Sequence, residues 1–228
     1  MMRAVAFLCA LAGACAASTA HAAARIAVAP IRIELASNAN FCSLHVSNLG
    51  QDKVAVQLRG FAWSQDTDGA DRLDPADIAV NPSIMELQAG QKRLVRCSLP
   101  PQAGAAESSH RLLVDELPRG NFSPGTMQTV LRLSLPIFRK PAGAMPALRW
   151  SAGDGSALHL RNTGGAHALI GKLIVTREGK KPETIERGFY LLAGARRPIT
   201  LAGGAAGITR IEAVMDTGKV DVVATAVE

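Results

Sequence analysis

The feature that most constrains this fold is an alternating stretch near the middle of the chain, Met127–Ile137, inside the longer segment His110–Pro141. Every second side chain falls on one largely apolar face, which carries Met127, Thr129, Leu131, Leu133, Leu135 and Ile137. A period of two predicts a β-strand. At ~3.3 Å per residue it would span about 36 Å, roughly twice an ordinary strand. We expect so long a strand to extend beyond its own sheet, where its edge could pair with another chain.

The start of the chain predicts export. A short, positively charged start, Met1–Arg3, precedes a run of small apolar residues, Ala4–Ala17, and Ala20-His21-Ala22 has the A-x-A form of a cleavage site. These features indicate a secretory signal peptide over residues 1–22. A membrane anchor is the alternative, but the run is shorter than the ~20 apolar residues of a spanning helix. We therefore expect no membrane insertion.

Charge, aromatic content and motifs argue against nucleic-acid binding and catalysis. The net charge is +6 without a long Lys/Arg run, and the aromatic content is 4%, which leaves few rings to stack on bases. No HExxH, GxSxG or phosphate-loop pattern occurs, and the histidines lack metal-ligand spacing. We expect a protein that is not an enzyme and that needs no cofactor or metal.

The cysteines predict one structural pair. Cys9 and Cys15 lie in the predicted signal peptide, which leaves Cys42 and Cys97. Each shares the parity of apolar neighbours in a strand-like segment, so each would face a core. An even pair in an exported protein predicts a disulfide. Two buried free thiols are the alternative.

The mature chain divides into two β-rich parts. Strand-like segments separated by turns fill residues 23–141 and predict an immunoglobulin-like sandwich with Trp63 in its core. The acidic stretch Gln65–Pro75 is expected to be a solvated loop within it. Ala142–Pro146 has the composition of a hinge, and shorter strands in residues 142–228 predict a second, smaller β-sandwich. The fold class is all-β.

Several phrases, in this order and spacing, resemble the PapD-like periplasmic pilus chaperones of the chaperone–usher pathway. They are VAPIRIEL, HVSNLG, LRGFAW, LQAGQKRLVRCSL, LLVDELP and LSLPIFRKP. LRNTGGAHALI and GFYLLAG in the second part also resemble that family, especially its archaic branch, which serves spore-coat-U-like and Csu-like pilins. The resemblance covers essentially the whole mature chain.

The resemblance implies two immunoglobulin-like domains in an L-shaped arrangement, in the periplasm. It implies pilin subunits and an outer-membrane usher as partners. The long strand would complete the sandwich of a subunit that lacks its own last strand, a form of β-augmentation. The side chains expected to fill the subunit groove are Met127, Thr129, Leu131, Leu133 and Leu135. The alternative is that these residues belong to the protein's own core, and we expect the half nearer Ile137 to do so.

The resemblance also implies a basic anchor for the subunit's terminal carboxylate. Arg32 corresponds to the first-strand arginine of the family, and a guanidinium can bind a carboxylate with two parallel hydrogen bonds. The family's second cation, a lysine on the long strand, is replaced here by Pro136. Arg111 on the neighbouring strand is the substitute candidate, and Arg132, Arg139 and Lys140 are weaker ones.

A charge cluster between the domains is the last implied feature. By order and spacing, Glu107, Lys140 and Asp216 fall on its positions, with lysine in place of the usual arginine. The rival interpretation of the whole chain is a secreted immunoglobulin-like adhesin or a pilus structural subunit. A pilin should have one incomplete domain and a free N-terminal donor segment, whereas this chain has two domains and an internal long strand.

Overall fold

The computed structural model describes residues 26–102, 106–118, 120, 128–153 and 156–225. All the helix or strand elements of these residues are strands, which confirms the all-β class. None of the described residues forms an apolar helix long enough to cross a bilayer. The predicted signal peptide and Met127 lie outside the described residues.

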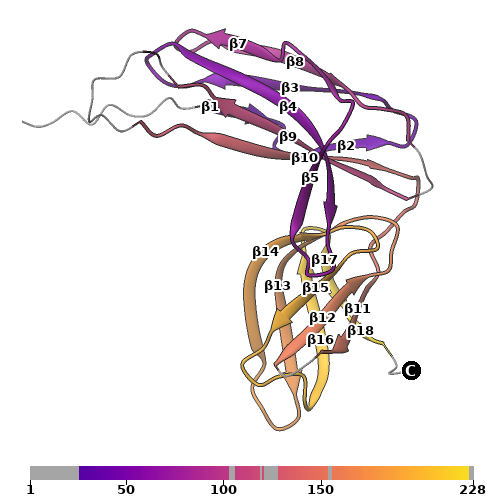
Figure 1. Ribbon diagram of the computed structural model, residues 1–228. Helices are drawn as coiled ribbons and strands as arrows, with labels where there is room; N and C mark the ends of the chain where they lie inside the picture. Colours follow the sequence, from indigo (N-terminus) through magenta and orange to yellow (C-terminus); the bar gives the residue numbers. More distant parts are fainter. Residues whose placement is uncertain (1–25, 103–105, 119, 121–127, 154–155, 226–228) are drawn as a thin grey trace, which may run out of the picture.

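The first sandwich consists of two sheets (Figure 1). One has the order β1-β3-β8-β6, from Ile26–Ala29, Phe41–Asn48, Lys92–Ser98 and Ala79–Asn81. The other has the order β2-β10-β9-β4-β5, from Ile33–Ala36, Arg132–Lys140, Ser108–Glu116, Val54–Gln65 and Asp71–Pro75, with β7 (Ile84–Leu87) paired to β4.

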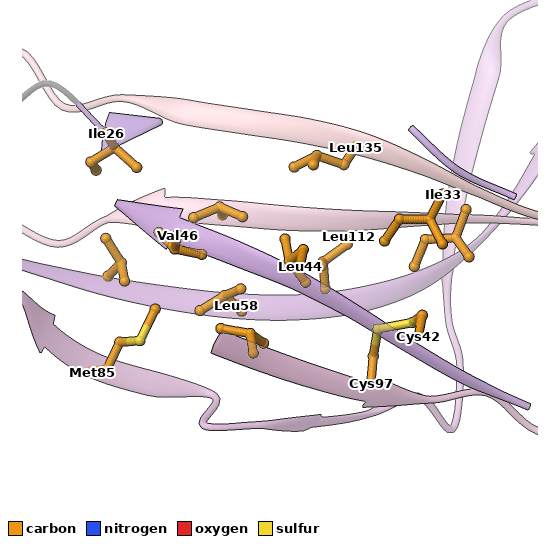
Figure 2. Close-up of a cluster of buried hydrophobic side chains, with 14 of the residues drawn as sticks. Ile26, Ile33, Cys42, Leu44, Val46, Leu58, Met85, Cys97, Leu112 and Leu135 are labelled. Carbon is orange, nitrogen blue, oxygen red and sulfur yellow. A yellow bond between two sulfur atoms is a disulfide. The ribbon is translucent and has the colours of Figure 1, made fainter. Parts of the chain in front are cut away.

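The core of this sandwich lies between the two inner faces. Figure 2 shows Leu44 and Val46 on one sheet approaching Leu58, Leu112 and Leu135 on the other. Each of these five side chains is at most 2% exposed. The alternation of apolar and polar residues in these strands therefore has its expected cause, because folding buries every second side chain in the core.

Cys42 and Cys97 form a disulfide at one end of this core (Figure 2). They are directly opposite each other in the antiparallel β3–β8 pair, with their Cα atoms 5.0 Å apart. That separation is within the range that a disulfide can span. The predicted pairing is confirmed.

The chain changes sheets at Pro30. β1 pairs with β3 in one sheet, whereas β2 pairs with β10 in the other, and the Ala29–Pro30 peptide is cis. The bend thus falls at a proline, which has no backbone N–H to donate within a sheet. It also breaks the parity count, because Ile33 enters the core while Arg32 faces away from it. Simple alternation along Ile26–Leu35 would place Arg32 on the same face as Ile26, and the change of sheet makes that count wrong.

The second sandwich lies at a bend to the first, which gives the L-shaped arrangement (Figure 1). Its sheets have the orders β15-β12-β11-β18 and β14-β13-β16-β17. The strands are Leu148–Ala152 (β11), Ala157–Asn162 (β12), Ala168–Arg177 (β13), Glu183–Leu191 (β14), Arg196–Thr200 (β15), Ile208–Met215 (β16), Gly218–Asp221 (β17) and Val223–Ala224 (β18). They enclose a separate apolar core. The strands thus fall into two groups, the first ending at Lys140 and the second beginning at Leu148; the domain limits 23–141 and 142–228 stay predictions.

Two predicted elements have different bounds. The expected loop Gln65–Pro75 contains β5, which pairs with the end of β4. All five β5 residues are exposed, so no apolar alternation marks this strand. The long strand runs over Arg132–Lys140 instead of Met127–Ile137. Its start is set by pairing with β9, where Arg132 stands opposite Asp115, which the apolar pattern does not encode.

Candidate functional site

The two predicted anchor arginines lie on one row of the second sheet. Arg111 on β9 is directly opposite Pro136 on β10. Arg32 precedes Ile33, which pairs with Ile137, so Arg32 lies beside Pro136 on the other side. Residues in one cross-strand row share a face, and two strand spacings amount to about 10 Å. The two guanidinium groups therefore flank Pro136 on the face turned away from the core.

Arg111 is the more enclosed of the two. Its side chain is 14% exposed, and its Cζ lies 3.6 Å from the centre of the Trp63 ring and 5.5 Å from that of Tyr190. This is cation–π packing. Burial lowers the pKa of Arg111, and Asp71, whose Oδ2 is 3.8 Å from Nη2, acts in the opposite direction. An arginine keeps its charge despite such a shift.

Arg32 is held by groups of both sandwiches. Its Nη1 donates to Oδ2 of Asp216 at 2.5 Å, and its Nε lies 2.9 Å from Oε1 of Glu34. The hydrogen bond to Asp216 raises the pKa of Arg32 against the lowering effect of burial, and the nearby Tyr190 side chain acts in the same direction as Asp216. Tyr190 on β14 is therefore in contact with both arginines, from the opposite sandwich. No local signal in the sequence marks Tyr190 for this role.

Aromatic side chains fill the junction beside the arginines. Trp63, Phe138 and Leu192 form a buried cluster against which Tyr190 packs, and the rings of Trp63 and Tyr190 meet edge to face at 5.5 Å. Trp63 is 4% exposed, but it faces the junction. The expectation that it lies in the core of the first sandwich is wrong, because odd-numbered residues of β4 near its end face away from that core.

The predicted interdomain charge cluster does not form as one group. Glu107 accepts hydrogen bonds from the backbone N–H of His167 at 2.9 Å and pairs with its Nδ1 at 3.0 Å. Asp216 pairs with Arg32. Within the described residues no ion pair joins Lys140 to either carboxylate. Glu107 and Asp216 thus each bridge the two sandwiches, but at separate places, because each is near a different basic partner.

The remaining basic candidates lie elsewhere. Arg139 is 1% exposed, its Nη1 donates to Oδ1 of Asn40 at 2.8 Å, and burial lowers its pKa. Arg132 and Arg59 both bond to the carboxylate of Asp115, a buried residue that the sequence did not single out. Hydrogen bonds from these two arginines lower the pKa of Asp115 against the opposing effect of burial. Neither Arg132 nor Arg139 joins the row at Pro136.

One edge of β10 is only partly covered. β2 pairs with Ile137–Lys140, whereas β9 pairs with the strand from Arg132 onward. In the described residues no strand pairs with the β2 side of Arg132–Pro136. Just before the strand, Leu131 continues the pairing toward β9, since its carbonyl accepts from the N–H of Glu116 at 2.8 Å. A short stretch of main-chain donors and acceptors is therefore available beside Arg32.

The predicted groove residues divide along this segment. Thr129 is exposed and Leu131 is 36% exposed, whereas Leu133 packs partly against the core. Leu135 is 2% exposed and belongs to the core of the first sandwich (Figure 2). Its inclusion among the groove residues is therefore wrong for this state of the protein. These positions agree with the expectation that the half of the segment nearer Ile137 belongs to the protein's own core and the other half does not.

Solved structures share this two-sandwich fold. A chain in the complex of the CsuC chaperone with the CsuE tip adhesion subunit, from archaic Csu pili of Acinetobacter baumannii, matches with a TM-score of 0.73 and 23% identity, over 89% of this chain and 100% of that one. The Escherichia coli chaperone DraB matches at 0.65 and 16%, over 89% and 98%. A chain in the complex of the Salmonella enterica SafA pilin with the SafB chaperone matches at 0.63 and 19%, over 88% and 96%.

No curated protein gives a significant sequence match. The family model of the pili and flagellar-assembly chaperones, PapD N-terminal domain, matches residues 25–145, which is more than half of the 228 residues. That range contains both sheets of the first sandwich, the uncovered edge of β10 and the two arginines. The chain belongs to the family of pili and flagellar-assembly chaperones.

Proposed function

We propose that this protein is a periplasmic chaperone that binds a pilin subunit by lending it a strand and then delivers the subunit to an outer-membrane usher. The observation that carries the proposal is the uncovered edge of β10 over Arg132–Pro136, next to a row with two arginines. The family is one of assembly chaperones and not of enzymes, which agrees with the lack of a catalytic motif in the sequence.

The uncovered edge supplies the main-chain part of the interaction. An incoming subunit strand would pair with N–H and C=O groups of β10 and thereby continue the sheet, as in other cases of β-augmentation. The side chains of Leu131 and Leu133, exposed or half-buried here, would enter the apolar groove of the subunit. Their burial would favour binding by roughly 1.5–3 kcal/mol for each fully buried leucine.

The arginine row supplies the polar part. A subunit strand that runs along β10 toward Pro136 would bring its terminal carboxylate between Arg32 and Arg111. Charge-assisted hydrogen bonds to a guanidinium are shorter and stronger than neutral ones. The packing of Arg111 on Trp63, with its Cζ 3.6 Å from the ring, holds one guanidinium in place before the subunit arrives. The carboxylate would thus set the register of the added strand.

Two of the similar structures support this partner class. One contains the CsuC chaperone with a tip adhesion subunit, and another contains the SafB chaperone with the SafA pilin. The rival function, a pilus structural subunit or adhesin, has no such support from the family model, which describes assembly chaperones. Delivery to an usher and export by residues 1–22 are parts of the same proposal.

The test is recovery of a pilin from the periplasm. The full-length gene is expressed in its native host with an affinity tag at the C-terminus, and the periplasmic fraction is purified and analysed by mass spectrometry. We expect a mature chain that begins at Ala23, in complex with a small β-rich pilin. A chaperone that is absent from the periplasm, or that is recovered there without any pilin, would contradict the proposal.

The anchor is tested by two substitutions in that experiment. Arg32→Ala and Arg111→Ala should each reduce pilin recovery strongly, because loss of one partner of a desolvated charge pair costs roughly 2–5 kcal/mol. Arg96→Ala is the matched control, because Arg96 is an exposed arginine on β8, in the other sheet. Wild-type recovery with both anchor variants would remove these arginines from the site.

A further inference from the structure

The anchor row already holds more carboxylates than cations. Arg32 contacts Asp216 at 2.5 Å and Glu34 at 2.9 Å, and Arg111 has Asp71 at 3.8 Å. Two guanidinium groups thus face three acidic side chains of the same chain. A further carboxylate entering this row would be repelled unless one of the three moved away, because opposite and like charges at these distances interact strongly.

The three acidic side chains differ in how easily they can leave. Glu34, on β2, is two residues after Arg32 in the chain and contacts Nε, so the short connecting backbone keeps it near this side of the guanidinium. Asp71 is too far from Arg111 for a hydrogen bond. Asp216 holds Nη1 of Arg32 from the turn between β16 and β17, in the other sandwich, and its side chain is 34% exposed. Asp216 therefore occupies the end of Arg32 that an outside ligand could reach, and it is already in contact with water.

We propose that Asp216 is an internal stand-in for the subunit carboxylate: it neutralises Arg32 in the free chaperone, and the terminal carboxylate of the pilin binds by taking its place. This inference rests on the proposed function. The exchange conserves the number of ion pairs at Arg32, so the guanidinium is never left without a carboxylate at the junction. The charge that leaves, on Asp216, is on an exposed turn where water can solvate it.

The junction has other contacts that would remain during the exchange. The side chain of Gln65 accepts from the N–H of Leu192 at 3.0 Å and donates to the carbonyl of Tyr190 at 2.9 Å. The ring of His167 stacks on Phe138 with 3.5 Å between centroids. Loss of the Asp216 contact therefore does not require the two sandwiches to separate.

If this is correct, removal of the Asp216 charge should strengthen binding of a peptide with a free terminal carboxylate and leave binding of its C-terminal amide unchanged. The probe is the last-strand peptide of the pilin that co-purifies with the wild type, synthesised as a free acid and as a C-terminal amide. The measured quantity is the ratio of the two dissociation constants, amide over acid. Asp216→Asn removes the competing charge with little change in shape, so the ratio should rise by about fivefold, the upper range for a partly exposed ion pair.

The matched control is Asp221→Asn on the same hairpin. Asp221 pairs with Arg210, whose Nε donates to its Oδ1 at 2.8 Å, so the variant makes the same change in net charge and also loses an ion pair. It should leave the ratio at the wild-type value. Thermal melting of both variants checks the fold. In the wild type, the ¹³C shift of the Asp216 carboxyl should move on addition of the acid peptide and stay fixed with the amide, which tests the exchange without any substitution.

The outcomes separate this inference from the anchor itself. The stand-in role would be overturned, with the anchor left intact, by either of two results. One is an amide-to-acid ratio for Asp216→Asn that equals or falls below that of the wild type. The other is a ¹³C shift of the Asp216 carboxyl that does not change when the acid peptide is added. If Arg32→Ala keeps the wild-type preference for the acid peptide, Arg32 is not the anchor, and the inference about Asp216 is refuted as well. A raised ratio in Asp216→Asn together with a lost preference in Arg32→Ala supports both.

Discussion

At the scale of single residues, His110 gives the fold a pH-dependent stability. It lies on β9, is 6% exposed, and stands opposite Ile137 and Ala62. Burial, together with a smaller contribution from the nearby charge of Arg139, lowers the pKa of His110 from 6.5 to about 4. The imidazole is thus neutral in the folded protein over most of the range in which the unfolded chain would protonate it.

The sign of the effect follows from proton binding. Between pH 6.5 and 4 the unfolded chain binds more protons at His110 than the folded one, so the free energy of unfolding falls as the pH falls. We expect this group to lower it by about 1–2 kcal/mol between pH 7 and pH 5. His110→Gln should remove that part of the acid sensitivity in denaturant unfolding at the two pH values. His45→Gln, on the partly exposed face of β3, is the control. An unaltered acid sensitivity in His110→Gln would refute the assignment.

At the scale of elements, β10 (Arg132–Lys140) and the residue just before it, Leu131, combine two roles. From Leu135 to Phe138 its side chains are buried, whereas Leu131 is 36% exposed. Leu131→Glu should therefore leave the melting temperature of the free chaperone nearly unchanged. In the complex it would place a charge in an apolar groove, which is costly without a partner. We expect pilin recovery from the periplasm to fall to a small fraction of the wild-type value.

Two further leucines control that experiment. Leu94→Glu changes an apolar residue that is 41% exposed in the other sheet, so both stability and pilin recovery should match the wild type. Leu135→Glu places the charge in the chaperone's own core, where the side chain is 2% exposed, and the chaperone itself should fail to accumulate. If Leu131→Glu behaves like Leu135→Glu, Leu131 belongs to the core; if it behaves like Leu94→Glu, the edge is not the subunit site.

The sequence predicted best those strands whose two faces differ. Alternation between core and water marks β3 (Phe41–Asn48) along its whole length and the second half of β8 (Lys92–Ser98). β5 was missed because both of its faces are exposed. In β14 (Glu183–Leu191) polar residues interrupt the apolar pattern, although the pairing of this one strand with β13 continues past a bulge. Local periodicity reports burial, not hydrogen bonding.

At the scale of the whole molecule, the site depends on how two sandwiches meet. Arg32 and Arg111 were predicted as anchors through the resemblance to the pilus chaperones. Their position near Tyr190, however, depends on the register of β9 and β10 and on the docking of β14. No pattern within either half could place Trp63 at the junction instead of in a core. A contact between residues 127 positions apart, such as Gln65 with Leu192, has no local signature.

Gln65 tests whether that junction is held by specific contacts. Its side chain makes two hydrogen bonds to the backbone of the second sandwich, at 3.0 Å to the Leu192 N–H and 2.9 Å to the Tyr190 carbonyl. Gln65→Ala leaves both groups without this partner, at a cost of roughly 1–3 kcal/mol for each group that stays out of water.

Gln57→Ala is the control, because Gln57 is on the same strand and face but far from the second sandwich. Small-angle X-ray scattering should show a broader distribution of distances for Gln65→Ala than for Gln57→Ala, since the two sandwiches would then move relative to each other. Because Tyr190 packs on Arg111 and Asp216 binds Arg32 only while the sandwiches stay docked, the preference of Gln65→Ala for a free-acid peptide should change as well. Unchanged scattering together with an unchanged preference would show that the aromatic packing and the Glu107–His167 contact fix the junction without Gln65.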